Sequence, residues 1–209
     1  GEGLDALEQF AQPRVQGRLA GSGEPTLYSR LGELLEGIKA LTGAPIVLLT
    51  NGSLFWMREV QEAALEADIV IPSLDAGRAL AFGHVNRPVQ GISFEKMVEG
   101  LVEFRERYTG QLWLEVFLLK QTAGEAELGE LTRMIRRIHP DKVQLNTVAR
   151  PTPGRQVYPV PPDELEQIAR RIGPNAEVIA RYEPAPPGGD AAPAAAVAAG
   201  DVLALIRRH

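Results

Sequence analysis

The chain has 209 residues, of which 44% are hydrophobic and 23% charged, so it can bury one sizeable core and does not have the composition of a disordered protein. Its formal net charge of −5 excludes the broad positive surface of a general nucleic-acid-binding protein. The absence of cysteine excludes disulfides, thiolate metal ligands and cysteine nucleophiles within this sequence. No apolar run is long enough to cross a membrane. A cytoplasmic protein without a membrane partner fits these features.

Short apolar runs alternate with segments of helical periodicity along most of the chain. The pattern predicts strands at 15–20, 45–50, 68–73, 112–119, 142–147 and 176–180. It predicts helices at 31–41, 60–67, 94–104, 128–138 and 163–172. This alternation favours parallel strands with right-handed crossovers, either in an open doubly wound sheet or in a barrel or part-barrel. In both architectures functional residues gather at the carboxyl ends of the strands.

The composition divides the chain into three parts. Residues 1–182 carry the alternating pattern and form the predicted domain. In 183–200, 15 of 18 residues are Ala, Pro or Gly, which is typical of a linker. Residues 201–209 resemble the start of a further helix or domain. Since the sequence begins with Gly1 and stops within this helical pattern, we expect it to be a fragment of a longer protein.

The first predicted strand runs into Gly21–Ser22–Gly23–Glu24–Pro25. Glycines let a backbone approach a ligand closely, and Pro25 favours an extended Glu24 whose carboxylate is held in one direction. Such a segment suits a ligand ammonium group. The alternative is an ordinary turn with a solvated glutamate.

Polar residues also follow the next two predicted strands. Asn51 belongs to Thr50–Asn51–Gly52–Ser53, where Asn-Gly is in any protein a strong turn signal. Ser73 and Asp75 follow the third strand and are ligand-binding candidates, although either can instead cap the following helix.

Three polar side chains are predicted on later strands. Glu115 alternates with apolar neighbours, and a carboxylate there needs a partner or a water-filled cavity. Gln144 and Asn146 share one face of their strand, where they can bind a heterocycle edge or simply pack as inward polar residues. His84 falls in a polar loop and His139 at a helix end. The histidines have no metal-ligand spacing, and no serine triad or Walker loop is present.

Taken in order, these segments resemble the radical S-adenosylmethionine (SAM) family, in particular a subgroup near the tRNA wyosine synthases and the glycyl-radical activating enzymes. The resemblance covers roughly residues 20–182. The segments that carry it are Gly21–Leu27, Thr50–Ser53, Pro72–Ala76, Asn86–Pro88, Gly91–Glu95 and Val143–Thr147.

The resemblance implies a partial (β/α)6 barrel of parallel strands with outer helices and SAM bound across its open top. It implies that Gly21, Ser22, Gly23 and Glu24 receive the amino group of the methionine moiety of SAM. Asn51 belongs to the same implied site, and Ser73, Asp75 and Glu115 become candidates for ribose and carboxylate contacts. Gln144 and Asn146 would lie near adenine.

The sequence departs from the family at its defining feature. Members carry a CxxxCxxC loop whose thiolates hold a [4Fe–4S] cluster, and this chain has no cysteine. We therefore expect the first βα unit to be missing and the chain as given to be catalytically silent. We predict no metal ligands in it.

Three interpretations remain open at this point. The chain is a fragment of an enzyme that reductively cleaves SAM to a 5′-deoxyadenosyl radical, with an electron donor as partner of the full-length protein. Alternatively, it is a cysteine-free nucleotide-binding or interaction module on the same barrel, or an unrelated α/β enzyme. The sequence does not identify the substrate, since fold does not settle function.

Overall fold

The computed structural model describes residues 18–19, 23–148 and 158–180. The elements in chain order are β1 (Arg18–Leu19), η1 (Pro25–Leu27), α2 (Leu31–Leu41), β2 (Val47–Thr50), α3 (Arg58–Ala64), β3 (Ile69–Pro72), α4 (Ala79–Val85), α5 (Phe94–Arg107), β4 (Gln111–Phe117), α6 (Glu125–Ile138), β5 (Lys142–Asn146), α7 (Pro162–Ile172) and β6 (Ala176–Val178). Here η1 is a short 3-10 helix.

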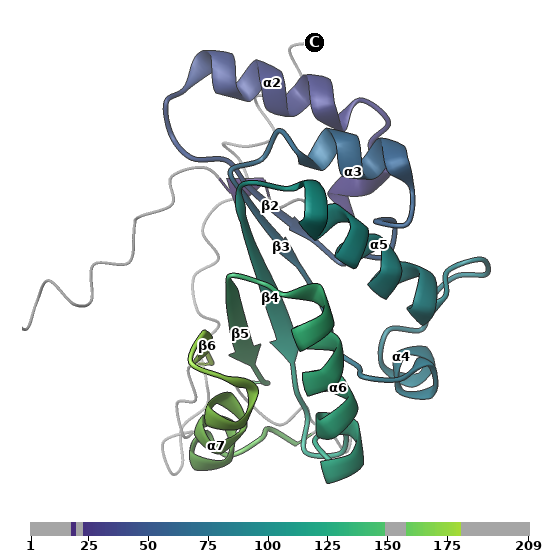
Figure 1. The fold of residues 1–209 in the computed structure, drawn as a ribbon, viewed down its shortest axis with the longest axis vertical. Coiled ribbons are helices and arrows are strands. Elements are labelled where there is room, and N and C mark those ends of the chain that lie inside the picture. The colour runs from purple at the N-terminus through teal and green to yellow at the C-terminus, as the bar shows by residue number, and fades with distance from the viewer. Residues whose placement is uncertain (1–17, 20–22, 149–157, 181–209) are drawn as a thin grey trace, which may run out of the picture.

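The strands form one sheet in the order β1-β2-β3-β4-β5-β6, so each pairs with its neighbour in sequence. All five pairings are parallel. Within the described residues β1 and β6 are the two edges, and the sheet does not close into a barrel. The strands fan out between α2 and α3 at one end and α7 at the other, with α5 and α6 lying along β3 and β4 (Figure 1).

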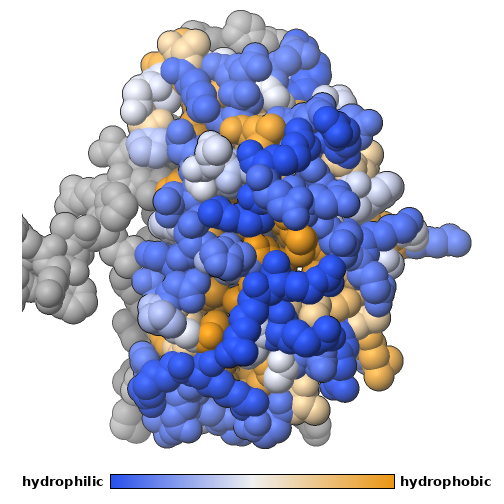
Figure 2. Space-filling view, in the orientation of Figure 1, coloured by the Kyte–Doolittle hydropathy of each residue, from blue (hydrophilic) through white to orange (hydrophobic). Residues whose placement is uncertain are grey.

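Side-chain alternation divides the sheet into a helix-covered face and a second face. In β4 and directly after it, the even-numbered residues from Leu112 to Leu118 are buried in the main core with the helices, whereas Trp113, Glu115 and Phe117 are partly exposed. Val47, Ile69 and Ile71 form a separate small apolar cluster with Leu49 and Trp113. The face seen in Figure 2 is largely hydrophilic, with hydrophobic atoms showing between elements and in a few exposed places.

The predicted α/β architecture of parallel strands with outer helices is confirmed, and it is a partial barrel. The predicted strands and helices are found with shifted ends, and His139 ends α6 in a left-handed conformation with φ 56°. The polar loop predicted around His84 is wrong, because this residue lies in the last turn of α4. The segments 183–200 and 201–209 lie outside the described residues, as does the chain before β1 that bears on a missing βα unit. Those expectations stay predictions.

Candidate ligand-binding site

A hollow of about 190 Å³ opens where β2 and β3 end, beside β4. Its lining combines the turn before η1 with the ends of these strands: Gly23, Glu24, Pro25, Leu49, Thr50, Asn51, Ile71, Ser73 and Glu115. Half of the ten binding residues predicted from the sequence meet here. Gly21 and Ser22 lie outside the described residues, and the other three lie elsewhere.

Glu24 joins the first turn of the site to the end of β2. Its Oε1 accepts hydrogen bonds from the Thr26 amide at 3.1 Å, the Thr26 hydroxyl at 2.7 Å and the Thr50 hydroxyl at 2.6 Å. Its Oε2 accepts from the Asn51 amide at 2.7 Å. The solvated glutamate of the turn interpretation is therefore wrong, since this carboxylate binds two segments together.

The turn after β2 is fixed by its own side chains. The Thr50 hydroxyl accepts from the Gly52 amide at 3.1 Å, and Asn51 Oδ1 accepts from the Ser53 amide at 2.9 Å. Gly52 has φ +72°, and an added Cβ would lie 3.2 Å from Pro72 Cβ, so glycine is required here. Asn51 thus forms the expected turn and also lines the hollow.

Ser73 and Glu115 lie side by side in the lining of the hollow. They form a parallel bridge that continues the β3–β4 pairing beyond the last residue of β3. Asn146 Nδ2 donates to Glu115 Oε1 at 3.2 Å from β5. The partner that a carboxylate in an apolar strand needs is therefore this amide of the neighbouring strand, and Asn146 itself is not in the lining of the hollow.

Asp75 does not line the hollow. Its Oδ1 accepts from the Phe117 amide at 2.9 Å and its Oδ2 from Asn86 Nδ2 at 3.1 Å, which fastens the loop after β3 to the end of β4. Helix capping by Ser73 or Asp75 is also excluded, since Arg78 is the N-cap of α4 and makes no side-chain cap. β3 ends at Pro72 and its pairing with β4 stops at the Ser73 bridge, so Asp75 lies beyond the paired strand.

Gln144 occupies a polar pair at the sheet edge. Its Nε2 donates to Glu177 Oε1 at 2.9 Å, and Lys142 Nζ lies 3.3 Å from the same oxygen. This matches the interpretation of Gln144 as polar packing between β5 and β6.

Sequence reasoning missed Leu49, Thr50 and Ile71 as lining residues, although their places at the ends of buried strands were a signal for them.

Burial raises the pKa of the Asp75 carboxyl above its usual range, and nearby Glu115 adds to this, although the Phe117 amide and Asn86 act against it. A group with a raised folded-state pKa stabilises the fold at low pH and loses that contribution as the pH rises through the raised value. Because Asn does not ionise, we expect the melting temperature of Asp75→Asn, whose oxygen still accepts from Phe117, to rise relative to that of wild type as the pH increases from about 4 to 7. Thermal unfolding of both proteins across this range measures the difference in melting temperature, called the gap here. A gap that shrinks with rising pH would contradict the assignment.

The residues of this chain do not fit an iron–sulfur cluster. Such a cluster is held by cysteine thiolates, and the sequence has none. In the described part of the chain, no group of three or more His, Asp or Glu side chains can hold a metal ion. None of the helices in that part is long and apolar enough to cross a membrane.

The chain is a parallel α/β partial barrel with a hollow where strands of its sheet end. Residues 2–135 match the model of the radical SAM superfamily. The chain belongs to this family, and the resemblance drawn from its motifs is confirmed.

Several curated relatives share more than a third of their aligned residues with this chain. A protein of Brachyspira hyodysenteriae named GTPase Obg is 42% identical over 160 residues, covering 76% of this chain and 24% of that protein. A UPF0026 protein of Synechocystis sp. is 38% identical over 151 residues, covering 72% and 57%. A UPF0026 protein of Helicobacter pylori is 38% identical over 150 residues, covering 71% and 48%. This chain therefore spans between a quarter and somewhat over half of these relatives.

Solved structures agree with the fold. A radical SAM methyltransferase from Sphaerobacter thermophilus has a TM-score of 0.62 at 18% identity, covering 84% of this chain and 54% of that one. A domain of pyruvate-formate lyase-activating enzyme from Bacteroides vulgatus has a TM-score of 0.61 at 14% identity, covering 77% and 96%. Archaeal TYW1 has a TM-score of 0.54 at 18% identity, covering 76% and 49%. At these identities the likeness concerns the fold alone.

Proposed function

We propose that this chain binds the amino-acid end of SAM in the hollow, as the ligand-binding part of a radical SAM protein. The observation that carries the proposal is the pair of carboxylates, Glu24 and Glu115, that come from two separate segments and line one hollow at the strand ends of this fold. A carboxylate is the strongest neutralising partner for an ammonium group. The family membership and a SAM-bound neighbour, SuiB of Streptococcus suis, with a TM-score of 0.55, favour SAM over other amino acids.

The hydrogen bonding of Glu24 leaves room for a ligand donor. An ionised carboxylate offers about four acceptor positions, two on each oxygen. Among the described residues, three donors bind Oε1, whereas the Asn51 amide alone donates to Oε2. We therefore assign the ligand ammonium to Oε2 of Glu24, beside the backbone of Gly23.

The size and walls of the hollow suit this part of SAM. Its volume of about 190 Å³ is below the range of about 300–1,000 Å³ usual for whole small-molecule sites. Leu49 and Ile71 offer an apolar wall to the methylene groups of methionine, and Ser73 offers a hydroxyl to its carboxylate. The nucleoside would extend along β4 and β5, past Asn146 and Gln144. Asp75 would hold the loop after β3 without touching the ligand.

Calorimetry with SAM and with 5′-methylthioadenosine, which lacks the amino-acid end, tests this assignment. We expect SAM to bind and Glu24→Gln to weaken SAM at least about tenfold, the effect of losing roughly 1.4 kcal/mol or more. Binding of 5′-methylthioadenosine should change little in that variant. Equal affinity of wild type for both ligands would contradict the placement of the amino-acid end in the hollow.

Reductive cleavage of SAM is not assigned to this chain, because the cluster that supplies the electron needs thiolates that the sequence lacks. We expect anaerobic reconstitution with iron and sulfide to give no stoichiometric cluster and no broad visible absorption band. Iron and sulfide analysis after gel filtration measures this. A cluster bound at one per chain would overturn the expectation.

A cysteine-free binding module on the same barrel is the second candidate, favoured by the absence of cysteine throughout the sequence. The parent reading frame separates the two: a CxxxCxxC motif upstream of Gly1 supports an enzyme, and its absence supports the module. The substrate of the enzyme is not part of either proposal. GTP binding is not carried over from the Brachyspira protein, because the sequence contains no G-x-x-x-x-G-K-[ST] phosphate loop.

A further inference from the structure

The loop that follows β3 leads from the proposed ligand site to the outer helices. Ser73 at its start lines the hollow, and Gly77 and Arg78 at its end lie against α6. The start is fixed by backbone hydrogen bonds from Ser73 to Thr50 and from Leu74 to Glu115. The middle is fixed by Asp75, as described above. What holds its end is a single side chain of α6.

Glu127 is that side chain. It is only 8% exposed, although it is a carboxylate on a helix. Its Oε1 accepts from the Gly77 amide at 2.5 Å and its Oε2 from Arg78 Nε at 2.7 Å. Both oxygens therefore serve the loop, and the position in the first turn of α6 favours the negative charge through the helix dipole.

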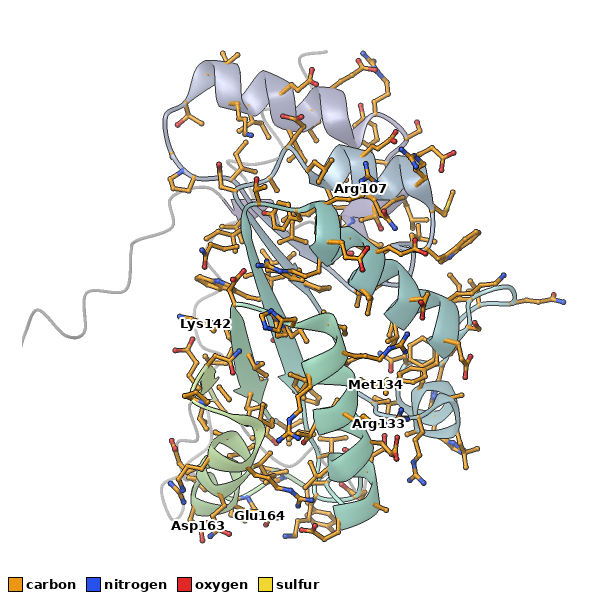
Figure 3. All side chains as sticks on the ribbon, viewed as in Figure 1. Arg107, Arg133, Met134, Lys142, Asp163 and Glu164 are labelled. Carbon is orange, nitrogen blue, oxygen red and sulfur yellow. The ribbon has the colours of Figure 1, made fainter. Side chains whose placement is uncertain are left out.

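The backbone geometry shows how close this contact is. A Cβ added to Gly77 would lie 2.3 Å from the backbone nitrogen of Leu131 and 2.7 Å from the carbonyl carbon of Glu130. The loop thus touches the backbone of α6 where only glycine fits, and its amide reaches Glu127 one turn earlier. Arg133 and Met134, one turn further along α6, lie on the side that faces α4, which begins directly after Arg78 (Figure 3).

We infer that Glu127 is a positioning residue for the ligand site, which holds the end of the loop 73–78 so that Ser73 stays in the wall of the hollow. The inference rests on the proposed function for its effect on SAM. The loop contact itself is independent of any ligand. Removing Glu127 leaves the buried Gly77 amide without its acceptor, and such a group is costly enough to open the loop.

Three variants separate this role from general destabilisation. Glu127→Ala removes both acceptors, and Glu127→Gln keeps an oxygen for the Gly77 amide while losing the charge that Arg78 pairs with. Glu125→Gln is the matched control, because it removes a carboxylate from the same helical turn whose partner is Arg171 on α7. Amide hydrogen exchange of residues 73–78 and SAM affinity are measured well below the melting temperature of each variant.

We expect Glu127→Ala to raise exchange at Gly77 and to weaken SAM about tenfold, the effect of one displaced hydrogen-bonding group. Glu127→Gln should restore most of the affinity, and Glu125→Gln should match wild type. Unchanged amide exchange at Gly77 in Glu127→Ala would show that Glu127 does not hold the loop. Faster exchange with full SAM affinity would show that holding the loop does not matter for the ligand site. If wild type does not bind SAM while Glu127→Ala still exposes Gly77 and shifts the Ser73 amide resonance, the proposed function fails and the positioning of Ser73 stands.

Discussion

Replacing Glu24 is expected to weaken SAM binding by about 10- to 150-fold, which corresponds to the loss of a hydrogen bond to a charged group worth about 1.5–3 kcal/mol. Two variants separate the ligand contact from the structural tie. Glu24→Gln keeps an oxygen for Thr26 and Thr50 but turns its NH2 toward the Asn51 amide, so we expect it to remain folded with a smaller loss of melting temperature than Glu24→Ala, while losing the charge that faces the ammonium. Glu24→Ala also leaves the buried Thr50 hydroxyl without its acceptor and should unfold at lower temperature. Calorimetry with SAM and a thermal melt measure the two effects.

Glu36→Gln, on the exposed side of α2, is the matched control and should change neither quantity. Binding of 5′-methylthioadenosine by Glu24→Gln should stay close to that of wild type. If Glu24→Gln binds SAM as tightly as wild type, Glu24 is only the tie between the two turns. The ammonium then has to be placed against Glu115.

Gly100→Ala is expected to destabilise the fold by about 1–3 kcal/mol, the usual cost of overpacking a core contact. An added Cβ would lie 2.4 Å from the carbonyl carbon and oxygen of Phe55 and from the Trp56 nitrogen, and none of these is the flexible end of a side chain. Phe55 is fully buried and packs edge-on against Phe104 of α5, so the turn cannot retreat easily. Urea unfolding of the variant and wild type gives the difference in free energy of unfolding.

Gly37→Ala is the control for this experiment, because it makes the same change within a helix. A Cβ at Gly37 meets nothing within 4 Å, and the residue is exposed on α2. Ala in place of Gly should therefore stabilise the protein by about 0.5–1 kcal/mol through helix propensity. If Gly100→Ala does not lower the free energy of unfolding below that of wild type, α5 and the turn at Phe55 can move apart to admit the added methyl group.

The sequence was sufficient for most of the fold because its strands and helices carry clear periodicity. The exception is α4, in which Phe82 is buried and Leu80 is exposed, so the sequence has no apolar stripe that would predict a helix there. Its packing depends on contacts with α5, including Phe82 against Phe94 at 5.8 Å between ring centroids. Such tertiary support cannot be read from a seven-residue pattern.

The site was predictable to the extent that it is local in sequence. Glu24 stood out in its turn, but its donors Thr50 and Asn51 lie beyond the next helix and only the fold brings them to it. Ser73 and Asp75 looked equivalent in sequence, yet the strand pairing stops between them, and Ser73 lines the hollow while Asp75 binds the Phe117 amide. Likewise, nothing in the sequence indicates that Glu127 reaches Gly77, because the two lie on different elements.

The strand order has a consequence for how the protein is made. Each strand pairs with the one that precedes it in the chain, so every pairing is possible as soon as that strand has left the ribosome. The turn at Glu24 and the ends of β2, β3 and β4 are all synthesised by Phe117, before α6 exists. The walls of the hollow can therefore begin to assemble on the nascent chain, and the loop after β3 receives its last contact only when Glu127 of α6 has been made. Synthesis proceeds in the same direction as assembly, from one edge of the sheet to the other.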